Sequence, residues 1–316
     1  MNPPPVRVKP SVGDPAPTPP RLRSESEVVA RWSSDRPVVS VICPAYQHAG
    51  FIKDAIHGFL GQDTDFPFEV VIRDDASTDG TAEIVRDYAQ RYPNVIRAVL
   101  ETENRYRKEG GGAVLRSMAR GEFIATCEGD DYWTDPRKLQ IQHDGLVDDP
   151  AAVASHHAVT VVRDGSIVHS EKRARRQCRD FSADELARNA RIITCSVMRR
   201  NVPLLEPQKG AIRVDMWTRA RLGLHGGARW EGTIAPSVHR LHGGGIWSPR
   251  TESERVRLQH EHFTRFAEEF QLSRHPELAR YYRRLSLALR LYGSVASLHP
   301  AVERLMASVR RRTWGT

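Results

Sequence analysis

Residues 123–133 read Phe123-Ile124-Ala125-Thr126-Cys127-Glu128-Gly129-Asp130-Asp131-Tyr132-Trp133. The run begins with apolar and β-branched residues and ends abruptly in three carboxylates around one glycine. This change predicts a buried strand whose C-terminal end opens into a polar site. Neighbouring carboxylates repel one another unless a cation neutralises them, and hard oxygen ligands suit Mg²⁺ or Mn²⁺. The stretch therefore indicates a metal site, with an acidic surface turn as the alternative.

Upstream of this stretch, strand-like segments alternate with helix-like segments. Apolar runs lie at residues 38–43, 70–72 and 95–100, and residues at helical spacing separate them from one another and from residue 123. Alternation at intervals of about thirty residues predicts an α/β fold with a Rossmann-like, doubly wound, mostly parallel sheet. Ligands of such sheets bind at the carboxyl ends of the strands. Three polar clusters fall at those ends: Pro44-Ala45-Tyr46, Asp74-Asp75 and Glu128 to Asp131.

The composition is that of a soluble globular protein. The chain has 316 residues, 40% of them hydrophobic and 27% charged, and no run approaches the roughly 18 apolar residues of a membrane span. Its N-terminus has no apolar secretion signal, and its four cysteines form no CxxC pair, which favours reduced thiols and a cytoplasmic location. The net charge of +8 fits anionic partners, whether nucleotide phosphates, anionic lipid or nucleic acid.

Four ordered motifs closely resemble those of family 2 glycosyltransferases with the GT-A fold. They are Val39 to Tyr46, Asp74 to Thr81, Glu128 to Pro136, and Arg137-Lys138-Leu139-Gln140. The resemblance is close from Pro37 to Leu146 and looser from Cys195 to Ser248. It implies an inverting, metal-dependent glycosyltransferase that moves a sugar from a nucleotide-sugar donor to an acceptor hydroxyl. Such an enzyme would serve the synthesis of cell-surface polysaccharide, glycolipid or another glycoconjugate.

The resemblance also assigns residues to the donor. Pro44, Ala45 and Tyr46 occupy the positions that cradle the nucleotide, and Asp75 occupies that of a carboxylate accepting a hydrogen bond from the base. Asp74 belongs to the same motif. Two cations in the loop after residue 100, Arg105 and Lys108, are candidate phosphate contacts, with a solvated charged loop as the alternative.

The metal site is implied by two further motifs. Glu128-Gly129-Asp130-Asp131 occupies the position of the DxD element, which binds the Mn²⁺ or Mg²⁺ held by the donor diphosphate. Because the first acid is Glu rather than Asp, we expect Asp131 as the first ligand and Asp130 as the second. His239-Arg240-Leu241-His242 resembles the YRxH element, so His242 is a candidate third ligand or diphosphate contact and Arg240 a candidate phosphate partner.

An inverting displacement also needs a base that takes the proton of the acceptor hydroxyl. Asp215, followed by Met216 and Trp217, resembles the Asp that carries this role in the family. A helix N-cap is the alternative role of Asp215, and Glu231 is the alternative base. Two tryptophans, Trp133 and Trp247, are candidates either for stacking on sugars or for core packing.

The sequence divides the chain into four parts. Residues 1–36 are rich in proline and are predicted to form a disordered tail, so we expect removal of Met1 to Ser33 to leave folding unchanged. Residues 37–149 and 150–250 are predicted to be the nucleotide-sugar-binding and acceptor-binding halves of the GT-A domain. Residues 251–316 are predicted to form a helical C-terminal extension. Within the second half, Asp164-Gly165 predicts a hairpin, and Ile192 to Met198 predicts a buried strand.

The C-terminal extension carries Arg280, Arg283, Arg284 and Arg290, interleaved with Leu285, Leu289 and Tyr292. This pattern allows either peripheral contact with an anionic membrane at its inner face or packing on the catalytic domain. The acceptor is expected to be a saccharide, a lipid-linked sugar or another hydroxyl compound, and no nucleic acid is expected.

Two other classes of protein fit parts of the sequence. A nucleotidyltransferase would share the sheet and the metal, but it usually has a glycine-rich signature where this chain has Pro44-Ala45-Tyr46-Gln47. A basic module that binds anionic lipid or nucleic acid would fit the net charge, but it leaves the acidic strand ends unexplained.

Overall fold

The computed structural model describes residues 11–105, 112–168, 178–188, 190, 192–204, 214–244 and 250–296. The described chain forms two compact units. The first ends at His242, and the second contains the two long C-terminal helices.

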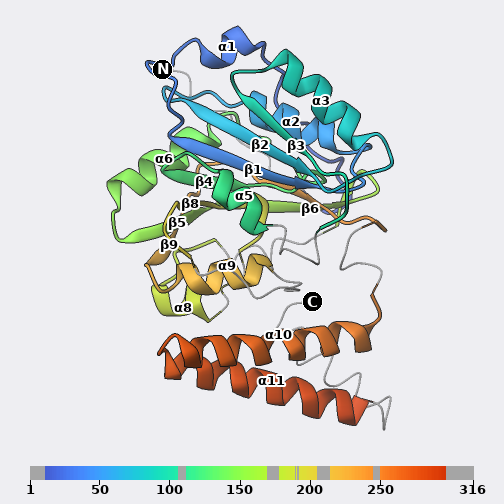
Figure 1. Ribbon diagram of the computed structural model, residues 1–316, viewed down its shortest axis with the longest axis vertical. Coiled ribbons are helices and arrows are strands. Elements are labelled where there is room, and N and C mark those ends of the chain that lie inside the picture. Colours follow the sequence, from blue (N-terminus) through green and yellow to red (C-terminus); the bar gives the residue numbers. More distant parts are fainter. Residues whose placement is uncertain are drawn as a thin grey trace. The chain divides into compact units, whose positions relative to one another are not determined.

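The first unit is built on a seven-stranded sheet with the strand order β3-β2-β1-β4-β8-β5-β9 (Figure 1). Strands β1 to β4 run parallel to one another, whereas β8 is antiparallel to both β4 and β5. A second, three-stranded sheet has the order β10-β6-β7. The predicted mostly parallel α/β fold is therefore confirmed. The strands are β1 Val39–Ala45, β2 Phe68–Asp74, β3 Ile96–Leu100, β4 Phe123–Thr126, β5 Ala152–His156, β6 Val159–Arg163, β7 Ser166–Ile167, β8 Met198–Arg200, β9 Gly227–Trp230 and β10 Ser237–Arg240.

Helices cover both faces of the large sheet because side chains alternate along each strand. On one face, Val41 of β1 and Val70 of β2 share a core with α2 (Ile52–Leu60) and α3 (Thr81–Arg91). On the other face, Ile42 and Val71 pack with Leu115 of α5 (Gly112–Met118) (Figure 1). The remaining helices of this unit are α1 Glu25–Val29, α6 Lys138–Asp148, α8 Ala183–Ala187, the 3₁₀ turn η1 Thr194–Ser196 and α9 Val214–Leu222.

The second half of the unit follows the sequence pattern less closely. The hairpin is confirmed, because β6 and β7 flank Asp164 and Gly165, which both have positive φ angles of 51° and 77°. The strand expected over Ile192–Met198 is wrong, since most of it is η1 and its flanks. Trp133 Nε1 donates to the Cys195 carbonyl at 2.8 Å, and Gln142 Nε2 donates to the Ser196 carbonyl at 2.9 Å. Side chains thus take the place of a strand partner there.

The structure contradicts the disordered tail over residues 11–36, which we call the N-terminal strap. Ser24 and Glu27 form a capping box at α1, and Val28 lies in the main core with 1% of its surface exposed. The ring of Trp32 meets that of Phe68 edge-on, with centroids 5.3 Å apart. Removal of Met1 to Ser33 would therefore strip a core contact from the sheet. Composition misled the prediction because an extended segment can dock through a few apolar residues without any helical or strand period.

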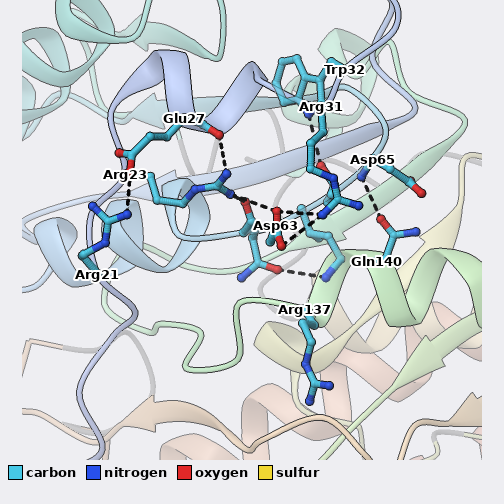
Figure 2. A network of polar contacts seen from close by, with 12 residues as sticks. Arg21, Arg23, Glu27, Arg31, Trp32, Asp63, Asp65, Arg137 and Gln140 are labelled. Carbon is cyan, nitrogen blue, oxygen red and sulfur yellow. Dashed lines mark hydrogen bonds and ion pairs between the residues drawn. The ribbon is translucent and has the colours of Figure 1, made fainter.

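Polar contacts attach the strap to the loop before β2 (Figure 2). Arg31 reaches Asp63 at 3.3 Å, and Arg23 donates to the Gln62 carbonyl. Farther upstream, the Pro17 carbonyl accepts a hydrogen bond from the hydroxyl of Tyr132. The strap therefore reaches the residue that directly follows the acidic cluster.

The second unit is a helix pair, as the sequence predicts up to the last described residue. Helix α10 (Glu252–Leu272) begins at a capping box formed by Thr251 and Glu254, and α11 is Pro276–Ala296. Aromatic rings join the two helices, including Phe270 and Tyr282, which stack with centroids 5.5 Å apart. Among the described helices, none is both long enough and apolar enough to cross a membrane.

Candidate active site

The parallel sheet brings the predicted polar strand ends together. Ala45 pairs with Asp74 at the end of β1 and β2, and the Ala45 carbonyl accepts from the Asp75 amide at 3.0 Å. On the other side of β1, the Pro44 carbonyl accepts from the Gly129 amide at 3.0 Å. The three clusters thus lie side by side at one edge, as expected for the carboxyl ends of neighbouring parallel strands.

Gly129 separates the acids because nothing larger fits there. A Cβ atom at this position would lie 2.6 Å from Ile52 Cδ1 and 2.9 Å from His48 Nδ1. The glycine lets the acidic loop pass directly beneath the loop between β1 and α2. This contact also brings in His48, which the sequence analysis did not single out.

The carboxylate of Asp131 is bound by the protein itself. It accepts from His239 Nδ1 at 3.0 Å and from the backbone amide of Arg240 at 2.9 Å. Next to it, Tyr132 and Val238 exchange backbone hydrogen bonds of 3.1 and 2.8 Å, which aligns β10 with the acidic loop. Although burial opposes it, the charge of Asp131 raises the pKa of His239 to about 9. Asp131 therefore anchors β10.

The carboxylate of Asp130 faces two imidazoles. His242 Nε2 lies 3.0 Å from Asp130 Oδ2, and His48 Nε2 lies 3.6 Å from the same oxygen. The ring of Phe51 packs against His242 with centroids 4.7 Å apart. The hydrogen bond to Asp130 raises the pKa of His242, whereas burial lowers the pKa of His48. Burial acts to raise the pKa of Asp130, but the hydrogen bond from His242 and the charge of His48 lower it, and the net shift is downward.

Arg240 ties the site to α2. Its Nη1 donates to the Asp130 carbonyl at 3.0 Å, and its Nη2 pairs with the carboxylate of Asp54. Its guanidinium also lies over the ring of Tyr132, 4.3 Å from the centroid. Arg240 therefore lies beside Asp130 and is held in one orientation, and its role as a phosphate partner stays a prediction.

The loop that carries His48 is locked to the loop before α3. The Thr81 hydroxyl accepts from the His48 amide at 2.8 Å, and Asp79 accepts from the Ala49 amide at 2.9 Å. Asp79 also accepts from the Thr81 amide, so it supports the start of α3. Gln47 holds a positive φ of 57°. These bonds fix the backbone that carries His48 beside the acidic loop.

The expected nucleotide contacts lie at the neighbouring strand ends. Tyr46 is 44% exposed, so its ring is open to a ligand. Asp74 is buried and accepts from the Ser77 amide at 2.9 Å, and Asp75 accepts from the Arg105 amide at 2.9 Å. The Arg105 guanidinium lies 3.8 Å from Glu101. Lys108 and Trp247 lie outside the described residues.

The two candidate bases differ in their surroundings. Asp215 is in the first turn of α9, with its carboxylate 2.8 Å from Arg219 and its side chain 30% exposed. Glu231 pairs with Arg229 at 2.7 Å and presses on Gly145 in the middle of α6, where burial raises its pKa. Trp133, fully buried with its Nε1 on a backbone carbonyl, belongs to the core.

The residues around Asp130 fit a divalent cation. Glu128 Oε2 is buried and has no hydrogen-bond partner among the described residues, and burial together with Asp131 and Asp130 raises the pKa of Glu128 to about 8. Such crowding of acids is what a cation relieves. Carboxylate oxygen with imidazole nitrogen is a donor set for Mn²⁺ or another transition ion. Across the described ranges, no three metal-binding side chains already surround one position. A cation would replace the His242 to Asp130 hydrogen bond.

Three histidines, His48, His239 and His242, face the two aspartates of this site, and Arg240 links the site to Asp54. No sequence motif predicted a contact for His239 or pointed to His48 and Asp54. Only His48 had a local signal, because it follows the first strand end by three residues. His239 and Asp54 depend on partners more than a hundred residues away.

Comparisons with known proteins identify the family and the fold of the chain. A family model for glycosyl transferase family 2 matches residues 40–202. An uncharacterised protein of Mycobacterium tuberculosis is 38% identical over 211 residues, covering 66% of this chain. The match covers about 60% of that relative's length.

Two solved structures share the fold. Staphylococcus aureus TarS in complex with UDP-GlcNAc has a TM-score of 0.51 and 18% identity, covering 72% of this chain and 66% of that one. The mannosyltransferase PcManGT from Pyrobaculum calidifontis, in complex with GDP-Man and Mn²⁺, has a TM-score of 0.54 and 22% identity, covering 96% and 86%. Because the family model matches more than half of this chain, the chain belongs to glycosyl transferase family 2, and it has a GT-A-like fold.

Proposed function

We propose that this chain moves a sugar from a nucleotide-sugar donor to an acceptor hydroxyl with inversion at the anomeric carbon, assisted by Mn²⁺ or Mg²⁺. One observation carries the proposal. Asp75, Asp130 and His242 come together at the carboxyl edge of the parallel strands, where a base-binding carboxylate and a diphosphate-binding cation would both be needed. Family membership supports the glycosyltransferase class over the nucleotidyltransferase alternative.

Residues 37–149 are proposed to bind the donor. The exposed ring of Tyr46 would stack on a base, and the buried Asp75, whose amide donates to the Ala45 carbonyl, would accept a hydrogen bond from that base. The backbone at Pro44 and Ala45 forms the floor between Asp75 and Gly129. Arg105, Lys108 and Arg240 remain the proposed phosphate partners. The fold relatives support this class of donor, since TarS was solved with UDP-GlcNAc and PcManGT with GDP-Man.

Asp130 and His242 are proposed to hold the cation, with His48 beside them. A bound cation would stabilise the charge that develops on the leaving diphosphate. Asp131, expected first from the sequence, is less suited because its carboxylate already receives His239 and the Arg240 amide. Its proposed task is to hold the backbone of β10, so that Arg240 and His242 face Asp130.

Asp215 is proposed to accept the proton of the acceptor hydroxyl. The carboxylate of Asp215 pairs with Arg219 at 2.8 Å, which holds it in one orientation at the start of α9. Its 30% exposed side chain leaves room for an acceptor to approach. Glu231 is a weaker candidate because its carboxylate is packed between Arg229 and the backbone of α6.

Residues 150–250 are proposed to bind the acceptor, which would be a saccharide, a lipid-linked sugar or another hydroxyl compound at the cytoplasmic face of the membrane. A relative points to surface polymers: TarS of Staphylococcus aureus, named a poly(ribitol-phosphate) beta-N-acetylglucosaminyltransferase, is 34% identical over 126 residues. We accordingly place the reaction in cell-surface polysaccharide or glycoconjugate synthesis.

Donor binding is tested by thermal shift with UDP, GDP, dTDP and CMP, each with and without Mn²⁺. A nucleotide that binds the folded state raises the free energy of unfolding, by about 2.7 kcal/mol at a concentration a hundredfold above Kd, and the melting temperature rises with it. We expect one nucleotide to act, and only with the cation. If none binds under either condition, the proposed donor site is wrong.

The base is tested with Asp215→Asn. We expect turnover to fall on the order of 10²- to 10⁴-fold, the usual contribution of a positioned base, while nucleotide binding stays at the wild-type level. Asp215 lies within the first turn of α9 and pairs with Arg219, so near-normal turnover in a folded variant would limit Asp215 to this structural role and direct the search to Glu231.

A further inference from the structure

The faces of α10 and α11 that point toward each other are packed together. From α11, Leu289 and Tyr292 are buried and Tyr282 stacks on Phe270 of α10. Ser286 also bonds His260 Nδ1 at 2.8 Å. Leu289 and Tyr292, for which the sequence left membrane contact and packing as alternatives, thus belong to the helix interface. A membrane contact would need other residues.

The outer face of α11 has such residues. Leu287 and Leu291 are 55% and 59% exposed, and they are four residues apart, so they lie one above the other on the helix. Four exposed arginines come before or between these leucines in the sequence. Since successive residues of a helix are about 100° apart, the four arginines lie on the same side of α11 as the two leucines. The acid on this exposed face is Glu277, in the first turn. The arginines are Arg280, Arg283, Arg284 and Arg290.

The outer face of α10 differs, although the two helices have equal length. Its exposed charges are mixed in sign, and one pair, Arg257 with Glu261, is 3.6 Å apart. Its exposed large apolar residue is Leu272, at the C-terminal end. Mixed charge is typical of a helix face in water. The exposed charged residues are Glu252, Arg257, Glu261, Arg265 and Glu268.

We propose that the outer face of α11 binds an anionic lipid surface, with Leu287 and Leu291 entering the interface and the arginines pairing with lipid phosphates. Each arginine near such a surface contributes about 1 kcal/mol, and exposed leucines gain from leaving water. The sequence after α11 contains Arg304, Arg310, Arg311 and Arg312 but one acid, Glu303. Its net charge is positive like that of the outer face of α11, so charge does not favour this segment as the partner of that face. Nucleic acid would explain the arginines but not the leucines between them. The proposal is independent of glycosyl transfer.

The test is sedimentation of the full chain with phosphatidylcholine vesicles, with and without phosphatidylglycerol. Wild type should bind only the anionic vesicles and should be released by salt. Arg280→Gln with Arg284→Gln should weaken binding about 30-fold, as expected from two arginines. Leu287→Ser with Leu291→Ser should weaken it at least about tenfold.

The matched control removes two arginines from α10, as Arg257→Gln with Arg265→Gln, and should bind like wild type. Circular dichroism and melting temperature establish that every variant is folded. No binding of wild type to anionic vesicles at low salt would overturn the proposal. So would an equal loss in the α10 control, or leucine variants that abolish self-association while vesicle binding stays unchanged. Inorganic phosphate should not compete at the concentrations at which vesicles bind; if it does, the face is a phosphate site and not a membrane site.

Discussion

Asp130 and Asp131 are adjacent in the chain and differ in almost everything else. Asp131 is buried and receives His239 and a backbone amide, so its carboxylate is committed to the fold. Asp130 faces the side chains of His242 and His48, and His48 Nε2 stands 3.6 Å away, outside hydrogen-bond distance. A partner of this kind can be exchanged for a metal ion, whereas a backbone amide cannot. Two like residues in a motif can thus divide into a ligand and an anchor.

The difference follows from the direction of each side chain around Gly129. The tight passage under His48 turns one carboxylate toward the loop after β1 and leaves the next one facing β10. Four predictions test this division, from the largest expected effect to the smallest.

Asp130→Asn should give the largest effect. Loss of the charge removes the proposed cation ligand, so we expect turnover to fall on the order of 10²- to 10³-fold, as when a group that stabilises transition-state charge is lost. Calorimetric titration with Mn²⁺ should show binding lost in this variant and retained in Asp144→Asn, which changes an exposed acid on α6. Full activity in excess chelator would contradict the role of the cation itself.

Asp131→Asn should act mainly on stability. The exchange leaves the partly buried His239 without its anion, and we expect a loss of about 1–3 kcal/mol in urea denaturation. Asp130→Asn in the same measurement should stay within about 0.5 kcal/mol of wild type. If Asp130→Asn lowers stability more than Asp131→Asn does, Asp131 is not the anchor of the pair.

The pair of Asp131 with His239 should also give stability a pH dependence. The pKa of His239 is raised in the folded state, to about 9, above its ordinary value of about 6.5. Its contribution is therefore fully present below about pH 6.5 and is lost as the pH rises through about 9. In chelator, the melting temperature of wild type should exceed that of His239→Gln most at about pH 6 and least at about pH 9.5. A difference that is constant with pH would mean that the pair is not ionic.

Tyr132→Phe should give the smallest effect. It removes only the hydrogen bond to the Pro17 carbonyl and keeps the ring under Arg240, so we expect a loss of about 0.5–1.5 kcal/mol with nucleotide binding unchanged. Limited proteolysis should show the strap more readily cut near Pro17. If cutting and stability both match wild type, the strap does not anchor the Asp131 side of the site.

The sequence by itself determined the parallel core and the acidic edge. Apolar runs ending at Cys43, Ile72 and Thr126 define three strands, and their polar ends must meet because parallel strands align their carboxyl ends. These features depend on residues close together in the chain, so period and composition reveal them. The roles of Asp215 as base and of the metal ligands also come from the sequence, and they stay predictions.

Only the tertiary structure decided how the site is partnered. His239 meets Asp131 and His242 meets Asp130 across more than a hundred residues. The N-terminal strap joins the core through Val28, and α11 buries Leu289 while leaving Leu287 in solvent. Each of these outcomes depends on which surfaces pack together, and neighbouring residues of one chemical type, such as two aspartates or two leucines, carry no local sign of the side on which they fall. Long-range packing, which no local pattern encodes, separates them.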